Sequence, residues 1–403
     1  MFLKPHILFV DDETNLLNGL RRGLRLKRDV WNMSFASSGE AALEIITNER
    51  VDLIISDMRM PQMDGAELLE RVREISPDTV RFILSGYAKQ ETVLKVVGPA
   101  HQYLAKPCDF DNLIERIEQV VELRNLLNDH LNIRKTLSGV KTIPSMAHIY
   151  HKFKQAINEE HVDKKNLIKT IELDIGLKSQ FFKVCNSAFF NLPNGTPNLE
   201  TSVQMLGVDV VRAMGELDGF FQPFEGDEKV AKILEQLCLN SLKISIIGRK
   251  IAEEVELDEG LHDHVGVACA LSHIGTFVIA LKWPDHFMQV RELANLKEMP
   301  IDAYERELIG MDHAMIGGYL LGLWGYPKLV WEAVAFHHRP ELCSSKEPAI
   351  LAILHLAQNI ARSMNLYPKI EDQDEIYLNY NFLAGQNFQE GNNKWQEILH
   401  RKF

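Results

Sequence analysis

The first 127 residues alternate short apolar runs with amphipathic segments, and this alternation limits the folds open to the chain. The runs with the length and composition of buried strands are 6–10, 32–36, 52–57, 81–85 and 102–106. Segments with a helical apolar stripe lie between them, and a final one begins near Phe110. Five such βα units predict a parallel sheet covered by helices on both faces, which is an α/β fold.

Polar side chains stand at the carboxyl ends of four of these runs. Asp11 and Asp12 follow the first run, and Asp57 ends the third; Ser85 and Lys106 end the fourth and fifth. Because ligands of a parallel sheet bind at that edge, we expect these side chains to converge. Three carboxylates repel one another without a cation, and their oxygens suit Mg²⁺. A lysine and a hydroxyl beside them suit a phosphoryl group.

These residues give the chain its resemblance to a known family. "VDDE", "SDMRMPQMDG", "ILSGYA" and "YLAKP" match, in order and spacing, the receiver domain of bacterial two-component response regulators. The resemblance implies a flavodoxin-like (βα)₅ receiver domain at residues 1–125. It also implies that a histidine kinase phosphorylates Asp57. Asp12, Asp57 and the backbone carbonyl of Arg59 would then hold Mg²⁺, with Asp11 acting through water.

The same resemblance assigns the residues that respond to the phosphoryl group. Ser85 and Lys106 would contact it, and Tyr103 would be the aromatic residue that changes rotamer. Pro107 would hold the loop after Lys106 through a cis bond. Added negative charge of this kind changes which of two conformations a domain prefers, so this half is expected to be a switch rather than an output.

The helical pattern of residues 110–127 continues through a linker at 126–139 without Gly or Pro until Gly139. Val120, Leu123, Leu127 and Leu131 keep one apolar stripe. One interpretation is a receiver helix followed by a short linker. The other is a continuous signalling helix that joins two domains or pairs with a second copy, because a long apolar stripe requires a partner. A homodimer would follow from this second interpretation.

From residue 140 the strand pattern ends and helical patterns dominate, which predicts an all-α domain at 140–365. "TIPSM", "KVCNSAFF", "QMLG", "DHAMIGGYLLGLWGYP" and "VAFHHRP" make residues 137–363 resemble the HDOD domain. That domain is a relative of the HD and HD-GYP metal-dependent phosphohydrolases, so an HD-like helical fold is implied. "NLPNGTPN" is expected to be a loop. The tail at 366–403 is expected to hold a short helix that docks on the domain or on a partner.

A phosphohydrolase of that kind needs His and Asp ligands that bind two metals and activate water. When the metal-ligand pattern of that family is aligned with this chain, Asn240, Ser272 and His273 stand at positions that usually bind metal. His273 stands at the position of the aspartate that bridges the two metals. Gln358 stands at the place of a late aspartate. The retained histidines are His313, His337 and His338.

Both carboxylates of that pattern are absent, so we expect a domain that is not an enzyme and holds no metal. The less favoured alternatives are a single Zn²⁺ or Fe ion on the imidazoles, or a cyclic-di-GMP phosphodiesterase with a degenerate histidine site. The expected partners are a histidine kinase and a protein bound by the HDOD domain. The classes expected for that protein are a cyclic-dinucleotide phosphodiesterase or another signalling enzyme.

The amino-acid composition limits the classes of partner further. The net charge is −12, and neither half is basic, which argues against binding of nucleic acid. The five cysteines are scattered without a Cys-x-x-Cys pair, as is typical of reduced thiols in a cytoplasmic protein. We expect no membrane association.

Overall fold

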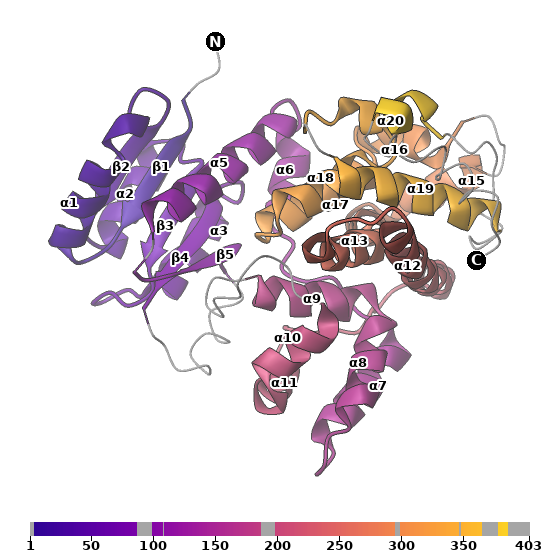
Figure 1. The fold of residues 1–403 in the computed structure, drawn as a ribbon. Coiled ribbons are helices and arrows are strands. Elements are labelled where there is room, and N and C mark those ends of the chain that lie inside the picture. Colours follow the sequence, from indigo (N-terminus) through magenta and orange to yellow (C-terminus); the bar gives the residue numbers. More distant parts are fainter. Residues whose placement is uncertain are drawn as a thin grey trace. The chain divides into compact units, whose positions relative to one another are not determined.

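The computed structural model describes residues 4–86, 99–107, 109–186, 198–294, 299–345, 348–364 and 378–385 (Figure 1). The chain divides into two units, one built mainly from residues up to 141 and the other mainly from residue 142 onward. The first is α/β and the second is helical, as the sequence predicts.

A five-stranded parallel sheet forms the centre of the first unit. Its strands are β1 (His6–Val10), β2 (Asn32–Ala36), β3 (Leu53–Asp57), β4 (Val80–Ser85) and β5 (Gln102–Ala105), in the order β2-β1-β3-β4-β5. Every predicted strand is confirmed to within one residue at each end. All five residues of β1 are buried, as expected of a strand covered on both faces.

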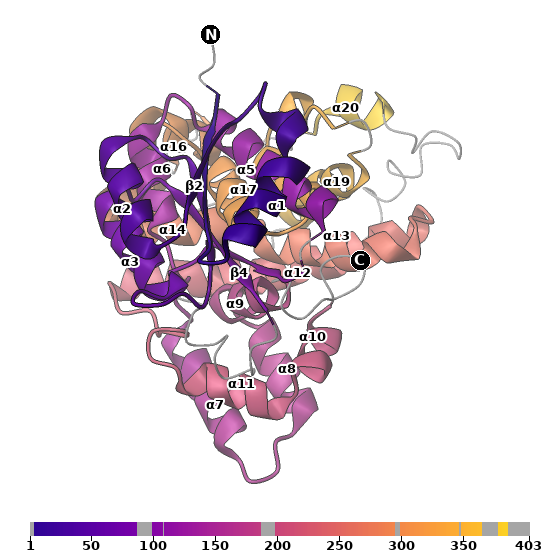
Figure 2. The same ribbon diagram turned by 90° about the vertical axis from the view of Figure 1, so that its left-hand side faces the viewer.

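Helices cover the two faces of this sheet. They are α1 (Thr14–Gly23), α2 (Gly39–Asn48), α3 (Gly65–Ile75) and α5 (Phe110–Leu126). Helix α6 (Leu131–Ser138) follows α5, and a 3₁₀ turn occupies Arg25–Lys27. In Figure 2, α1 and α5 lie on one side of the sheet and α2 and α3 on the other. The helix predicted at 91–97 lies outside the described residues.

The first turn of α3 fixes the end of β3. Asp64 caps this helix by accepting a hydrogen bond from the Glu67 N–H. A Cβ atom at Gly65 would overlap the carbonyl oxygen of Asp57, so only glycine allows this close approach. The "MDG" sequence thus sets the position of Asp57 in the sheet.

The continuous helix from 110 to 139 is not observed, so that interpretation of the linker is wrong. Helix α5 ends at Leu126, and α6 begins at Leu131 after a turn. In this turn the N–H groups of Leu127 and Asn128 bond to carbonyls three residues earlier instead of four. Asn128 and Asp129 are residue types whose side chains compete with helical hydrogen bonds, which accounts for the break.

The second unit is a set of packed helices. They are α7 (Ala147–Asn158), α8 (Lys164–Glu172), α9 (Ile175–Cys185), α10 (Leu199–Leu206), α11 (Val208–Glu216), α12 (Glu228–Glu254), α13 (Glu259–Leu271), α14 (Ile274–Lys282), α15 (Pro284–Ala294), α16 (Ile301–Ile309), α17 (His313–Leu323), α18 (Lys328–Phe336), α19 (Ala349–Ser363) and α20 (Tyr380–Gly385). A 3₁₀ turn occupies Pro340–Leu342. The predicted loop at 191–198 and the end of the tail lie almost wholly outside the described residues.

The apolar run at residues 259–282 has the pattern of a single helix, but in the structure it forms two helices, α13 and α14. The backbone leaves helical geometry at His273, which precedes the first turn of α14 with φ −97° and ψ 10°. Residues 259–282 have the length and hydropathy of a membrane span, but 94% of their apolar window is buried inside the protein. Such burial is typical of core helices. The break turns His273 toward its neighbours in the second unit.

Candidate functional site

The carboxyl edge of the sheet brings together Asp11, Asp57 and Lys106. The Lys106 ammonium lies 2.7 Å from Asp11 Oδ2 and also pairs with Asp57 Oδ1. Burial lowers the pKa of Lys106, but the hydrogen bonds and charges of the two carboxylates outweigh burial and raise it. Asp11 is 1% exposed and Asp57 is 7% exposed, whereas the neighbouring Asp12 is exposed.

Backbone hydrogen bonds orient the two buried carboxylates. Asp57 Oδ2 accepts from the N–H of Arg59 at 2.8 Å. Asp11 Oδ1 accepts from the N–H of Glu13 at 2.9 Å. Because carboxylate oxygens that share one ammonium also attract a hard divalent cation, this donor set fits Mg²⁺.

The remaining receiver residues lie on β4, β5 and the following turn. Tyr103 is buried, and burial raises its pKa well above the usual value. The Lys106–Pro107 bond is cis, as predicted. Ser85 ends β4 as predicted, but its side chain is outside what the structure describes.

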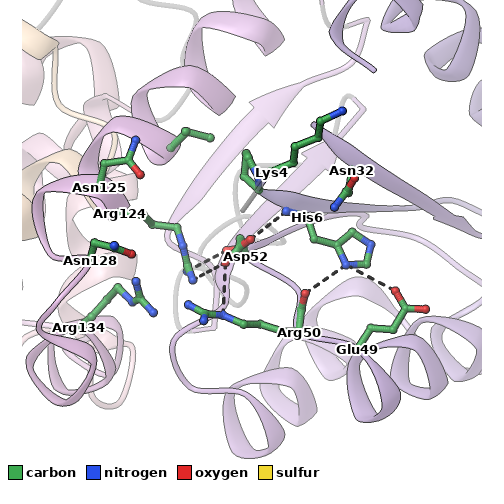
Figure 3. Close-up of a pocket in the computed structure, with 12 residues that line it drawn as sticks. Lys4, His6, Asn32, Glu49, Arg50, Asp52, Arg124, Asn125, Asn128 and Arg134 are labelled. Atoms are coloured by element: carbon green, nitrogen blue, oxygen red, sulfur yellow. Dashed lines mark hydrogen bonds and ion pairs between the residues drawn. The ribbon is translucent and has the colours of Figure 1, made fainter. Parts of the chain in front are cut away.

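A cleft of about 580 Å³ lies at the opposite, amino-terminal edge of the sheet (Figure 3). Asp52 stands at its centre and accepts hydrogen bonds from the His6 N–H at 2.8 Å and from the Arg124 guanidinium at 2.6 Å. These contacts tie the end of α5 to the start of β1 and β3. The cleft is therefore distant in the fold from the acidic edge that the sequence predicts as the site.

Sequence reasoning missed the charged residues that hold α6. Arg134 of this helix lies 3.1 Å from Asp78 Oδ2. Arg81, at the start of β4, donates 2.9 Å hydrogen bonds to the carbonyl oxygens of Pro99 and Ser138. Burial lowers the pKa of Arg81 to about 10. An arginine inside an apolar run such as "VRFIL" is the signal that could have indicated a buried partner.

Three of the predicted histidines of the helical domain form a cluster. His313 begins α17, whereas His337 and His338 follow α18. Their ligand atoms lie within 4.8 Å of one another, and His313 Nε2 is 3.1 Å from His338 Nε2. A Cβ atom at Gly275 would overlap the carbonyl oxygen of His313, so the Ile-Gly after His273 permits this approach of α14 to α17.

Two acidic residues that the sequence did not single out adjoin the cluster. Glu305, 2% exposed on α16, accepts hydrogen bonds from the His313 backbone N–H at 2.8 Å and from Nδ1 at 2.7 Å. Asp312 pairs with Arg306 at 2.7 Å and Arg339 at 3.1 Å. In the sequence, Glu305 precedes His313 by eight residues and Asp312 precedes it by one, and this spacing is the only signal that marks them.

These charges separate the pKa values of the histidines. Burial lowers the pKa of His313, but the charge and hydrogen bond of Glu305 outweigh burial and raise it. The pKa of His337 falls to about 3, mainly through burial and also through the charge of His313. Burial likewise lowers the pKa of His273 well below its usual value.

The residues at the other ligand places of the hydrolase pattern hydrogen-bond one another and their neighbours. Gln358 Nε2 donates to Ser272 Oγ at 3.0 Å. His273 Nδ1 lies 3.1 Å from Ser241 Oγ, and its ring stacks on His313 with centroids 5.9 Å apart. Asn240 is fully buried and accepts a hydrogen bond from Gln236.

Comparisons with known proteins agree with the two units. A model of the response regulator receiver domain matches residues 7–118, and a model of the HDOD domain matches residues 143–340. The signal receiver domain of an HD domain-containing protein from Pseudomonas fluorescens Pf-5 is 31% identical, with a TM-score of 0.29; the match covers 30% of this chain and 98% of that one.

Curated relatives match the first unit. The hydrogenase transcriptional regulatory protein HoxA of Bradyrhizobium diazoefficiens is 35% identical over 152 residues, which are 36% of this chain and 31% of that protein. The transcriptional regulatory protein GlrR of Escherichia coli is 36% identical over 121 residues, 30% of this chain and 27% of that protein. The chain thus spans less than a third of the length of these relatives. It belongs to the two-component response regulators, with a receiver domain at residues 7–118 and an HDOD domain at residues 143–340.

Proposed function

We propose that phosphorylation of Asp57 by a histidine kinase switches an HDOD domain that acts by binding another protein in the cytoplasm. The observation that carries the proposal is the pairing of Lys106 with both Asp11 and Asp57 at the carboxyl edge of the sheet. This pairing supports the proposal, because a carboxylate nucleophile and a divalent metal would both need the carboxylate oxygens gathered beside this ammonium.

The phosphoryl step uses the Asp57 carboxylate as nucleophile. One oxygen attacks the phosphorus of a phosphohistidine, a P–O bond forms, and the P–N bond breaks with its electron pair passing to the imidazole. Mg²⁺ held by Asp12, Asp57 and the Arg59 carbonyl, with Asp11 through water, would supply positive charge to the phosphoryl oxygens. Lys106 would pair with the product, and Ser85 would donate a hydrogen bond to it.

The output is proposed to be binding rather than hydrolysis. Two-metal hydrolysis requires a bridging carboxylate, but His273 takes that place and is engaged with Ser241. Among the described residues of the helical domain, the cluster that could hold a metal contains imidazoles and no carboxylate. By analogy with the fold alone, the partner is a signalling enzyme, and a cyclic-dinucleotide phosphodiesterase is the first class to test.

The test uses the full-length protein with acetyl phosphate as phosphodonor. We expect the intact mass of the wild type to rise by one phosphoryl group in a Mg²⁺-dependent manner, and Asp57→Asn to remain unmodified. Asp64→Asn is the matched control, because Asp64 is an exposed cap of α3 and asparagine also caps helices. Phosphorylation of Asp57→Asn to the wild-type level would contradict the assignment.

The output is tested separately with a candidate phosphodiesterase. We expect its activity to differ between the phosphorylated wild type and Asp57→Asn. Hydrolysis of cyclic-di-GMP by this protein alone, abolished in His313→Ala, would overturn the binding role and establish the phosphohydrolase alternative.

A further inference from the structure

We propose that His313, His337 and His338 form a binding site for one divalent transition-metal ion of the Zn²⁺ class inside the HDOD domain. The observation behind it is the convergence of three imidazole nitrogens within 4.8 Å of one another. The site is independent of the phosphorylation switch and of the output proposed above. It departs from the sequence-based expectation that this domain holds no metal.

Hydrogen bonds on the far side of two rings fix which nitrogens are available. His337 Nδ1 lies 2.7 Å from the carbonyl oxygen of Val334, and His313 Nδ1 lies 2.7 Å from Glu305 Oε2. Both oxygens accept only, so each Nδ1 carries the proton and each neutral ring presents an Nε2 lone pair. Such carbonyl and carboxylate partners are the usual orienting groups of metal-binding histidines.

The strongest evidence for a bound metal ion comes from the Nε2 atom of His337. The residue is 1% exposed, and this nitrogen has no hydrogen-bond partner among the described residues. A buried acceptor without a partner destabilises the folded protein. A proton shared between His313 Nε2 and His338 Nε2 would satisfy that pair but not His337, whereas one metal ion would satisfy all three nitrogens.

The spacing of the nitrogens is close to that of a coordinated set. Tetrahedral Zn²⁺ binds imidazole at about 2.0–2.1 Å, which places two ligand nitrogens about 3.3 Å apart. The His313 and His338 nitrogens are already 3.1 Å apart. Small side-chain rotations that bring the remaining pairs inward from their 4.8 Å limit would complete the site.

Charge and neighbouring contacts favour a single ion. The buried carboxylate of Glu305 offsets part of the positive charge of a divalent metal. Asp312 is held by Arg306 and Arg339, and His273 Nδ1 is engaged by Ser241, so a second ion is not supported. Three protein ligands leave a fourth position for water or an exchangeable ligand.

The experiment uses the full-length chain made without a polyhistidine tag. We expect about one Zn²⁺ or Co²⁺ per chain by elemental analysis after incubation and desalting, and a higher midpoint of thermal unfolding with either ion. His337→Ala and the partly buried His338→Ala should lose both effects. Glu305→Gln should bind roughly 10- to 100-fold more weakly, because it removes an orienting carboxylate but keeps its shape.

The matched control is His264→Ala. His264 is a buried histidine of the same domain that bonds to the Gly260 carbonyl and lies outside the cluster. It should bind metal like the wild type, and circular dichroism should show that every variant is folded. Absence of metal from the wild type, or equal binding by His338→Ala and the wild type, would overturn the assignment.

Discussion

The guanidinium of Arg81 donates a 2.9 Å hydrogen bond to the carbonyl oxygen of Ser138, joining the start of β4 to the last residue of α6. The same carbonyl lies 3.1 Å from His101 Nε2. Both contacts lie within the receiver unit and are buried. They make α6 an extension of the receiver domain rather than a free linker.

Replacing Arg81 should therefore release α6. Arg81→Met removes a buried charged donor from several carbonyl oxygens, and we expect the receiver unit to lose about 3 kcal/mol of stability. Hydrogen exchange measured by mass spectrometry should show faster exchange at residues 131–138. Arg71→Met, which removes an exposed helix pair with Glu67, should change stability by less than about 0.5 kcal/mol. Unchanged exchange in α6 would disprove this role of Arg81.

Glycine 65 should be intolerant of any side chain. Gly65→Ala forces a Cβ atom against the Asp57 carbonyl, so we expect lower stability and at least tenfold slower labelling by acetyl phosphate. The control is Gly19→Ala in the middle of α1, where a Cβ atom meets nothing within 4 Å. That change should stabilise the domain by about 0.5–1 kcal/mol. Normal labelling of Gly65→Ala would show that β3 accommodates the shift.

The Lys106 ion pairs should stabilise the receiver domain up to alkaline pH. Its folded pKa is raised, so the contribution is complete below the ordinary lysine pKa of about 10.4 and disappears as pH rises through the higher folded value. Lys106→Met should lower the midpoint of thermal unfolding by several degrees at pH 8, and the difference should shrink above pH 10.5. A difference that stays constant across this range would mean that the lysine acts through packing alone.

The buried cysteines should be unreactive in the folded protein. Burial raises the pKa of Cys185 and of Cys269 to about 12, and it raises the pKa of Cys238 as well. Maleimide labelling followed by peptide mass spectrometry should modify the half-buried Cys343 on the order of 100-fold faster than these three. All four should react at similar rates in denaturant. Fast labelling of Cys238 in the native protein would indicate local opening of α12.

The sequence predicted the receiver half better than the helical half, for physical reasons. Strands buried on both faces are continuous apolar runs, and the acidic residues at their ends mark the candidate site directly. The break at His273 lies inside a run that is apolar on both sides, so the pattern of apolar residues favours a single helix. Glu305 contacts His313 through helix packing, which sequence spacing does not encode. The apolar stripe continues through the turn at Asn128 and Asp129, so periodicity could not decide between a short linker and a continuous helix.

The turn between α5 and α6 extends the folded receiver domain to the end of α6. An unbroken helix from Phe110 to Ser138 would extend about 43 Å. Because the chain instead turns at Leu127–His130, Ser138 at the end of α6 is held at the amino-terminal edge of the sheet, opposite the edge that holds Asp57. A gene fusion cut at residue 125 would thus discard part of a folded domain, while one cut after Gly139 would keep it whole.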